Sequence, residues 1–424
     1  MAEIRPFRAI RYNDKLLDSM EQLIAPPYDV LNSEEQLSLY QLSPYNIIRL
    51  EYGKTYPDDS ADHNRYSRAA QTLSSWLAEG VLQPEEQKTL YLYEQSFKYG
   101  AAQYCRRGII AALKVEKYSS GKVLPHELTF STPKADRFEL LRKTRTNISP
   151  IFTLFPDPDA NISKLLSEIS KTEPLFVLED QSEQRHQITR IDNPALQNEI
   201  VEFMKPQALL IADGHHRYET ALEYKDFESN ATGSAADYIL TILVSMKEPG
   251  LLMLPTHRMI SRLNNKSAEK LVSICRNNFT LMLMGKEIIN SEKDFQAEWK
   301  KMTQVKNAFA IIAPDFIALL IPKVETGKER LGVELLHEMI IDPFLSLPEV
   351  NGDMKNSLTY PHDFESIRKT VLNENRDSIA FILDPIPVDE VYTRAMQGKV
   401  MPQKTTYFYP KLPSGLLLRN LDLD

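Results

Sequence analysis

Apolar and polar residues follow one another along this chain in blocks that predict both helices and strands. Residues 90–97 and 105–115 are rich in β-branched, aromatic and other apolar side chains and flank Gly100, which predicts an antiparallel pair of strands. In 61–79, apolar residues recur at three- and four-residue intervals before Gly80, as is typical of a helix that ends at a glycine. The pattern therefore predicts a mixed α/β (α+β) fold.

Further along, the same periodicities continue beyond a break in the pattern. Prolines, a glycine and a run of polar residues interrupt 248–265, which is typical of a domain boundary. After this break, predicted helices alternate with the short apolar segments 308–313, 316–321 and 378–383. We therefore expect two domains, 1–248 and 249–424, the second being an α/β layer packed on the first.

One apolar run stops abruptly at a cluster of polar groups. Ala208–Ala212 predicts a short buried strand, Asp213-Gly-His-His-Arg217 follows, and a helix is expected from Arg217. Gly214 would then be the pivot of a strand-to-helix turn. A helix N-terminus carries unpaired N–H groups and a partial positive charge, so it binds anions, and a guanidinium in its first turn adds phosphate affinity.

Each of these residues also has a purely structural explanation when it is taken alone. Asp213 can be a helix cap, His215 and His216 can be packed histidines, and Arg217 can be a solvated helix residue. Their joint occurrence at one turn favours a phosphate site instead.

Composition excludes several classes of function. The chain has 424 residues, a net charge of −8 and a pI near 5.7, so no general attraction to nucleic acid or to an anionic membrane is expected. Cys105 and Cys275 are the only thiols, which argues against a disulfide scaffold and favours a reducing cytoplasm. Neither a GxGxxG motif nor a P-loop is present, so a nucleotide would bind in another way. The absence of a leader or long apolar run predicts a soluble, cytoplasmic protein.

The turn and seven other segments together resemble a bacterial and archaeal family catalogued as a domain of unknown function. The turn contributes Asp213–Ala221, and the other matching segments are Arg5–Arg11, Ala25–Val30, Tyr45–Glu51, Leu124–Glu127, Asn147–Phe152, Pro255–Arg258 and Met401–Lys404. That family is similar to the ParB and sulfiredoxin superfamily, whose members bind nucleotide phosphates at a Gly-x-x-Arg or Gly-x-His-Arg turn. The resemblance implies a ParB-like core elaborated by large insertions.

Within that superfamily, free-serine kinases carry the turn most similar to Asp213-Gly-His-His-Arg217. Sulfiredoxin chemistry requires a cysteine in the turn, where this chain has His215 and His216. The resemblance therefore points to phosphate chemistry without a thiol.

Several residues outside the turn are candidates for the same site. Asp29 follows two prolines and Glu127 ends Leu124-Pro-His-Glu127, so either carboxylate can accept a proton from a substrate hydroxyl. Arg258 can provide a second phosphate contact, and the segment 404–411 carries two lysines that can reach a polyphosphate, of which the resemblance favours Lys404. Solvated or structural roles remain the simpler explanation for each.

Two functions from different classes follow. In the first, the chain is a nucleotide-dependent phosphotransferase: Gly214, His216 and Arg217 hold the phosphates of ATP or ADP, and His215 or His216 stabilises the transferring group. Asp213 would orient a histidine or bind Mg²⁺, and a small hydroxyl-bearing metabolite such as L-serine would be the acceptor.

In the second function, the turn binds and slowly hydrolyses a nucleotide as a regulatory switch. A phosphate-ester hydrolase is a third, less favoured alternative.

Overall fold

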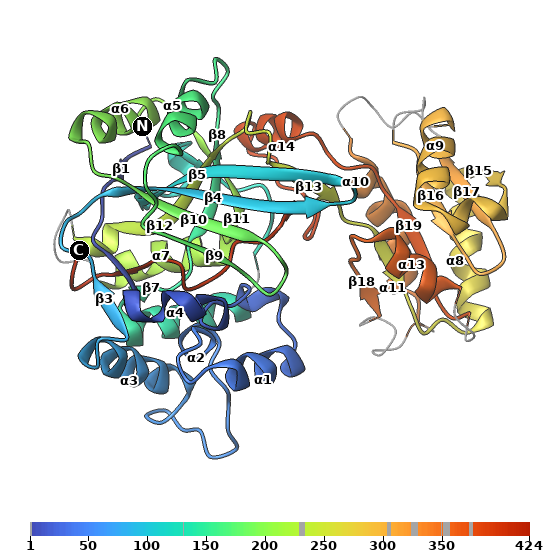
Figure 1. Ribbon diagram of the computed structural model, residues 1–424. Helices are drawn as coiled ribbons and strands as arrows, with labels where there is room; N and C mark the ends of the chain where they lie inside the picture. Colours follow the sequence, from blue (N-terminus) through green and yellow to red (C-terminus); the bar gives the residue numbers. More distant parts are fainter. Residues whose placement is uncertain are drawn as a thin grey trace. The chain divides into compact units, whose positions relative to one another are not determined.

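A computed structural model of the protein is drawn in Figure 1. It describes residues 2–129, 131–228, 234–302, 307–323, 330–348, 350, 357–372 and 376–424. The chain forms two compact units, and it passes from one to the other more than once. The first unit comprises Met1–Leu252, Val388–Val400 and Phe408–Asp424, and the second comprises Met253–Pro387 and Met401–Tyr407.

A large mixed sheet forms the centre of the first unit. Within the described residues its strand order is β6-β11-β8-β12-β5-β4-β10-β9, and β1 pairs with β5. The strands are β1 (Ile4–Arg5), β4 (Leu90–Tyr99), β5 (Ala102–Lys114), β6 (Val123–Leu124), β8 (Ile151–Phe155), β9 (Phe176–Glu179), β10 (Arg185–Ile191), β11 (Leu209–Asp213) and β12 (Tyr238–Ser245). The predicted pairing of the segments 90–97 and 105–115 is confirmed, since β4 and β5 are antiparallel neighbours.

A second, smaller sheet in this unit joins segments that are far apart in the sequence. Its order is β3-β2-β21-β7, with β2 (Ala9–Tyr12), β3 (Leu82–Pro84), β7 (Thr146–Asn147) and β21 (Leu418–Asn420). The alternating residues Ile4–Ile10 do not form one continuous strand, because β1 ends at Arg5 and β2 begins at Ala9. Pro6 between them has no N–H to donate to a ladder, and the chain leaves one sheet for the other there.

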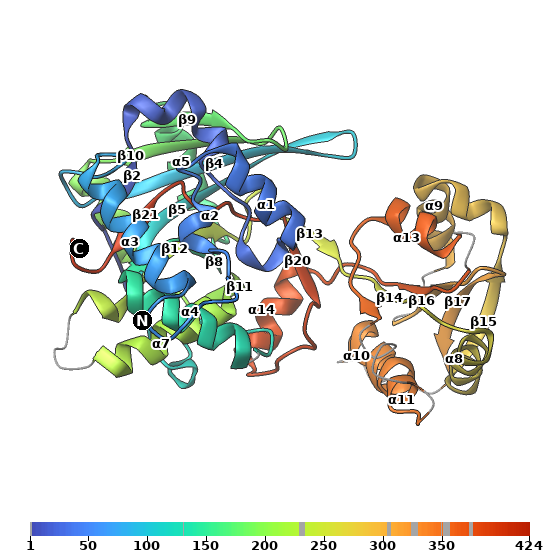
Figure 2. The ribbon, with the colours of Figure 1, turned by 90° about the horizontal axis from the view of Figure 1, so that it is seen from below.

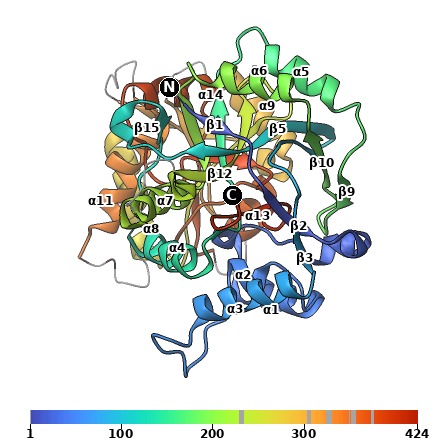
Figure 3. The same cartoon turned by 90° about the vertical axis from the view of Figure 1, so that its left-hand side faces the viewer.

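Helices of the first unit supply the rest of its core. They are α1 (Ser33–Leu42), α2 (Ile48–Glu51), α3 (Arg65–Ala78), α4 (Ser131–Thr144), α5 (Asn161–Ile169), α6 (Pro194–Met204), α7 (His215–Glu228) and α14 (Val388–Met396), with short 3-10 segments at Asp14–Gln22, Tyr28–Val30, Tyr118–Ser120 and Ala235–Asp237. In Figure 3, α1, α2 and α3 lie together. Asn32 and Glu35 form the capping box of α1. The sequence pattern favours Ser33 and Gln36 for this role, each one residue later than the observed pair.

The core of the large sheet fixes the position of α7. Ile162 and Leu166 of α5, Met204 of α6 and Tyr218 of α7 pack with strand residues in one buried cluster. Each fully buried side chain of this size contributes roughly 1.5–3 kcal/mol. Figure 2 shows α7 beside α4, and Thr220 Oγ1 donates to the Lys134 carbonyl oxygen at 3.3 Å. Contacts with the buried cluster of the sheet and with α4 therefore fix the position of α7.

The second unit has its own sheet and helices. Its strand order is β15-β17-β16-β19-β14-β18. The elements are β14 (Arg258–Ile260), α8 (Asn265–Asn278), β15 (Phe279–Met284), the 3-10 segment Lys286–Asn290, α9 (Glu292–Met302), β16 (Phe309–Ile312), β17 (Ile317–Pro322), α10 (Gly332–Leu336), a π-helical turn His337–Ile341, α11 (Asp342–Leu345), β18 (Leu358–Thr359), α13 (Phe364–Val371) and β19 (Ile379–Ile382). Strands β13 (Leu252–Pro255) and β20 (Thr406–Tyr409) span unit boundaries.

The mixed α/β class predicted from the sequence is confirmed, and the region beyond residue 249 contains α/β structure as expected. The domain division 1–248 and 249–424 stays a prediction, since a compact unit need not fold independently. Within the described part of the chain, no helix combines the length and the apolar character needed to cross a bilayer.

Candidate functional site

The predicted strand-to-helix turn lies between β11 and α7. Asp213 ends β11, Gly214 has a φ of +90°, and α7 begins at His215, two residues earlier than expected. A Cβ on Gly214 would lie 3.0 Å from Ile151 Cγ2 and 3.1 Å from Arg217 Nε, so glycine is needed for the backbone conformation and for the close approach of Arg217. The Gly214 carbonyl oxygen accepts from the Tyr218 N–H at 2.9 Å. The N–H groups before Tyr218 therefore belong to the open end of the helix.

Two cations share the Asp213 carboxylate. Arg217 Nη2 donates to Oδ2 at 2.7 Å, and Lys411 Nζ donates to Oδ1. Arg217 Nη1 also donates to the Pro150 carbonyl oxygen. The three side chains are 11% (Arg217), 16% (Asp213) and 17% (Lys411) exposed. Burial raises the pKa of the Asp213 carboxyl, but the charges of Lys411 and Arg217 outweigh it and hold the pKa below its usual value. Asp213 is therefore ionised at neutral pH.

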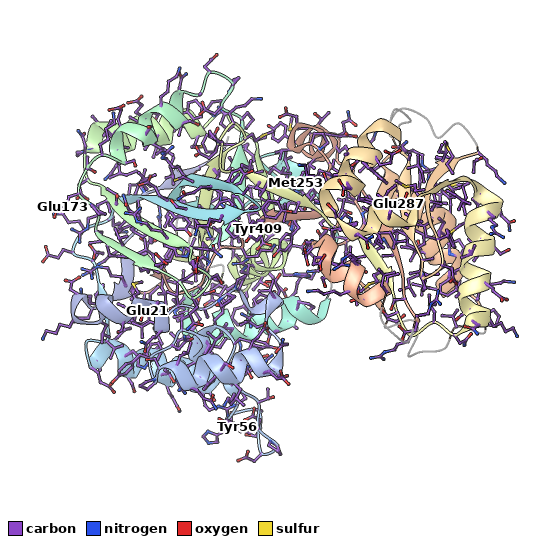
Figure 4. The ribbon with its side chains drawn as sticks, turned by 45° about the vertical axis from the view of Figure 1, so that its right-hand side comes forward. Glu21, Tyr56, Glu173, Met253, Glu287 and Tyr409 are labelled. Atoms are coloured by element: carbon purple, nitrogen blue, oxygen red, sulfur yellow. The ribbon has the colours of Figure 1, made fainter. Side chains whose placement is uncertain are left out.

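A third cation, Arg106, supports the segment that carries Lys411. Its guanidinium donates to the carbonyl oxygens of Pro410 at 2.7 Å and Tyr409 at 3.3 Å (Figure 4 labels Tyr409). Arg106 is 1% exposed, and burial lowers its pKa to about 10, so it stays charged at neutral pH. The negative charge of Asp213 acts on it in the opposite direction. Two cations thus contact Asp213, and a third holds the segment that carries one of them.

Two buried histidines lie behind the turn. His126 Nδ1 donates to the Ile211 carbonyl oxygen at 2.7 Å, its backbone N–H donates to His215 Nε2 at 3.4 Å, and the two rings meet edge to face at 4.7 Å. Burial lowers the pKa of His126 to about 4, and burial together with His126 lowers the pKa of His215. Both rings are therefore neutral at neutral pH, whereas the neighbouring His216 is only half-buried.

The structure brings the predicted Leu124–Glu127 segment to this turn, because β6 pairs in parallel with β11. Glu127 follows His126 directly and is half-buried. Asp29 lies in the 3-10 segment Tyr28–Val30 and is exposed. Burial raises the pKa of its neighbour Tyr28 to about 12, while the charges of Arg137 and Arg217 lower it. The segment that carries Asp29 therefore lies within electrostatic reach of the turn.

A small pocket of about 40 Å³ adjoins Arg217. Its polar lining includes Glu51, which is 2% exposed, and Arg137, which is 6% exposed. Arg137 Nη1 and Ser149 Oγ donate to Glu51 Oε1 at 3.3 Å and 3.0 Å. The Arg137 guanidinium also lies 4.0 Å from the centre of the Tyr28 ring. A buried carboxylate and a hydroxyl therefore lie beside the turn.

Sequence reasoning did not single out Glu51 or Arg106. It indicated that Arg137 belongs to a basic helix face, which is more often solvated but can frame an anionic ligand. One signal for Glu51 was available: it ends the otherwise apolar run Ile47–Leu50, in which Arg49 is the one other charged residue. Arg106 had no such signal, since it lies in a strand next to a second arginine, Arg107. Lys411 was one of two lysines considered, and Lys404 was the one favoured.

The two remaining predicted residues belong to the second unit. Arg258 is fully buried: its Nε donates to His337 Nε2 at 3.0 Å, Nη1 to the Thr256 carbonyl oxygen at 2.7 Å and Nη2 to the Gln403 carbonyl oxygen at 3.2 Å. Lys404 is exposed, with a φ of +54°. The geometry of Arg258 gives it a structural role, because its donors are directed to protein acceptors.

The predicted role of Asp213 as a Mg²⁺ ligand stays a prediction. Arg217 and Lys411 each donate to one of its two oxygens. Over the described part of the chain, no three His, Cys, Asp or Glu side chains are grouped as metal ligands would be.

The chain was compared with solved protein structures. The structures to which it is similar include those of the following three proteins. One is a conserved hypothetical protein from Pyrococcus furiosus, with 16% identity, a TM-score of 0.37, and coverage of 75% of this chain and 97% of that chain. A mutant free serine kinase in complex with ADP has 13% identity and a TM-score of 0.40 over 75% of this chain and 94% of that chain. SbnI from Staphylococcus aureus has 9% identity and a TM-score of 0.40 over 74% and 89%.

No curated protein matches the chain. A family model matches residues 4–336, which include the turn and Leu124–Glu127. The protein therefore belongs to the family described as "Protein of unknown function (DUF1015)".

Proposed function

We propose that the protein is a nucleotide-dependent phosphotransferase that acts on a small hydroxyl-bearing metabolite, with free serine as one acceptor. The observation that carries the proposal is the pairing of two features: a helix-start turn with two cations, and an adjoining pocket whose lining includes Glu51, Ser149 and Thr220. A nucleotide switch needs only the first feature. An enzyme that transfers a phosphoryl group also needs contacts for the acceptor, and the pocket at Glu51 can provide them.

The turn would hold the nucleotide phosphates. Arg217 supplies a planar guanidinium that suits phosphate oxygens, Lys411 supplies a mobile point charge, and the open N–H groups of α7 add further donors. His216, at the same helix end, would stabilise the transferring phosphoryl group as charge develops. These groups act by positioning and charge neutralisation, which is the main contribution a protein makes to phosphoryl transfer.

The acceptor would bind on the Glu51 side of Arg217. Glu51 can pair with an ammonium group, and Ser149 and Thr220 can contact a carboxylate or hydroxyl. The acceptor oxygen would attack the terminal phosphorus as the bond to the nucleotide oxygen breaks, and the hydroxyl proton would pass to a carboxylate. Asp29 and Glu127 both remain proposals for that base, since both lie on segments near the turn.

The proposal is tested by looking for the product directly. Purified protein is incubated with ATP or ADP and a pool of free amino acids that includes serine, with and without Mg²⁺, and new phosphorylated species are detected by mass spectrometry. We expect a phosphorylated hydroxyl amino acid that is lost in Arg217→Ala and reduced in Glu51→Gln.

The matched control is Arg142→Ala, which removes an exposed arginine of α4 that pairs with Glu139. It should leave product formation unchanged. Nucleotide binding or slow hydrolysis without any phosphorylated acceptor would contradict the phosphotransferase and favour the switch.

A further inference from the structure

Mostly buried cations share one carboxylate at the turn. Arg217 and Lys411 both donate to Asp213, and the other acceptor of Arg217 is the neutral carbonyl oxygen of Pro150. Arg106 is fully buried, and the charges of Asp213 and Glu248 both act on it. An anion that reached the turn would therefore compete with Asp213 for Arg217 and Lys411.

Arg106 is a further cation near the turn. It is 1% exposed, and in the described part of the chain its Nε–H has no hydrogen-bond acceptor, as is also the case for Arg5 and Arg49. The charge of Asp213 acts on Arg106, so an anion beside Asp213 would act on it as well.

Asp213 is placed where it competes with such an anion. Its two oxygens take one donor from Arg217 and one from Lys411, the two side chains best placed to bind phosphate at this turn. Lys411 reaches Asp213 across 198 residues of sequence, from a segment held by Arg106 through the carbonyl oxygens of residues 409 and 410. A lysine on a flexible stem can turn from one acceptor to another without movement of the backbone.

We propose that Asp213 is an internal substitute for phosphate: its carboxylate holds Arg217 and Lys411 in the ligand-free protein, and a phosphate group takes Lys411 from Asp213 when a nucleotide binds. The inference deepens the proposed function and rests on it for the identity of the ligand. Lys411 then joins Arg217 as a phosphate-binding residue, and Asp213 becomes a residue that lowers phosphate affinity while it keeps the cations in place.

This inference predicts an effect opposite to that of an ordinary binding residue. Asp213→Asn keeps the shape of the side chain and an oxygen that can accept from Arg217, but it removes the competing charge. We expect the affinity for inorganic pyrophosphate, measured by isothermal titration calorimetry on the full chain, to rise at least tenfold in Asp213→Asn. Lys411→Met should lower it at least tenfold, and the double variant should lose most of the gain, because the two residues act on each other.

Glu139→Gln is the matched control, since it removes a carboxylate from an exposed arginine pair on α4. It should leave pyrophosphate affinity unchanged. Unchanged or weaker binding by folded Asp213→Asn would overturn the inference. If that variant does not fold, Lys411→Met and Lys411→Gln decide the matter: unchanged pyrophosphate affinity in both would overturn it.

The test is separate from that of the proposed function. Pyrophosphate affinity is measured without an acceptor or turnover, so a failure to form phosphorylated product leaves this result intact. Conversely, a phosphotransferase in which Asp213→Asn weakens pyrophosphate binding would retain the proposed function and lose the inference.

Discussion

The chain contains two His-Arg pairs in very different surroundings, His216-Arg217 in the first unit and His257-Arg258 in the second. Arg217 lies in the first turn of a helix, after a glycine with positive φ, and donates to a carboxylate. Arg258 begins a strand inside the second unit's sheet and donates to carbonyl oxygens and to His337. The same two residue types thus pair with a carboxylate at a helix start in one unit and with groups of the protein interior in the other.

The backbone explains the difference. At a helix start the N–H groups and the macrodipole favour negative charge, so an arginine there has anionic partners. A buried strand position offers an arginine only the polar groups of the protein interior, and each donor must find one. His-Arg by itself therefore predicts neither role, and the predictions below test the contrast.

The largest effect is expected on the stability of the second unit. Arg258→Met would leave three carbonyl oxygens and His337 without their donor, and we expect a loss of about 3–5 kcal/mol. The two tryptophans make the measurement specific, because Trp76 belongs to the first unit and Trp299 to the second. Urea unfolding followed by fluorescence in a Trp76→Phe background reports on Trp299. A loss below about 1 kcal/mol in the free energy of unfolding would contradict the structural role of Arg258.

Arg217→Ala should have the opposite profile. We expect nucleotide affinity to fall at least about 100-fold, close to 2.7 kcal/mol, because a partly buried charge pair with phosphate is lost. The stability loss of the first unit, read from Trp76 in a Trp299→Phe background, should be smaller than that of the second unit in Arg258→Met, because Lys411 still pairs with Asp213. Wild-type nucleotide affinity in a folded variant would contradict the phosphate-binding turn.

Acid should weaken the second unit through His257. Burial, with the charges of His362 and Arg258, lowers the pKa of His257 from 6.5 to about 3. Between these values the unfolded chain binds a proton that the folded chain excludes, so stability falls as pH drops below 6.5, by roughly 2 kcal/mol at pH 5.

His257→Asn keeps an acceptor for the Leu383 N–H, which donates to His257 Nδ1 at 3.2 Å, and should flatten this part of the pH profile. The comparison is urea unfolding of both proteins at pH 7 and pH 5, followed at Trp299. Equal losses in the variant and the wild type would assign the acid sensitivity to other groups.

The smallest effect concerns His216. If it stabilises the transferring group, His216→Ala should lower kcat about tenfold, near 1.4 kcal/mol, and change nucleotide affinity much less. Steady-state kinetics and calorimetric Kd values on the same preparations separate the two effects. Parallel losses in kcat and affinity would make His216 a binding residue, like Arg217.

Local patterns in the sequence were sufficient for the turn and insufficient for its surroundings. An apolar run, a glycine and a polar cluster are adjacent in the chain, so the strand, the turn and the helix after it could be predicted together. The tertiary structure brings three further residues to the site: Arg106, Glu51 and Lys411. The periodicity of one segment does not predict which distant segments become its neighbours or where their side chains point. The predicted phosphate contact of Arg258 differs from its observed role for the same reason. Its sequence neighbours Pro255, Thr256 and His257 are typical of a loop, but two of its hydrogen-bond partners are His337 and Gln403, which are distant in sequence.

The way the chain passes between the two units has a consequence for biosynthesis. Asp213 leaves the ribosome 198 residues before Lys411, and at 5–20 residues per second this corresponds to about 10–40 s. During that interval, the first unit also lacks β21, which pairs with β2 near the start of the chain. Until the last segment arrives, the nascent protein must therefore keep an open edge on β2, and Asp213 has Arg217 but not Lys411 as a partner. The proposed phosphate site is incomplete during this time.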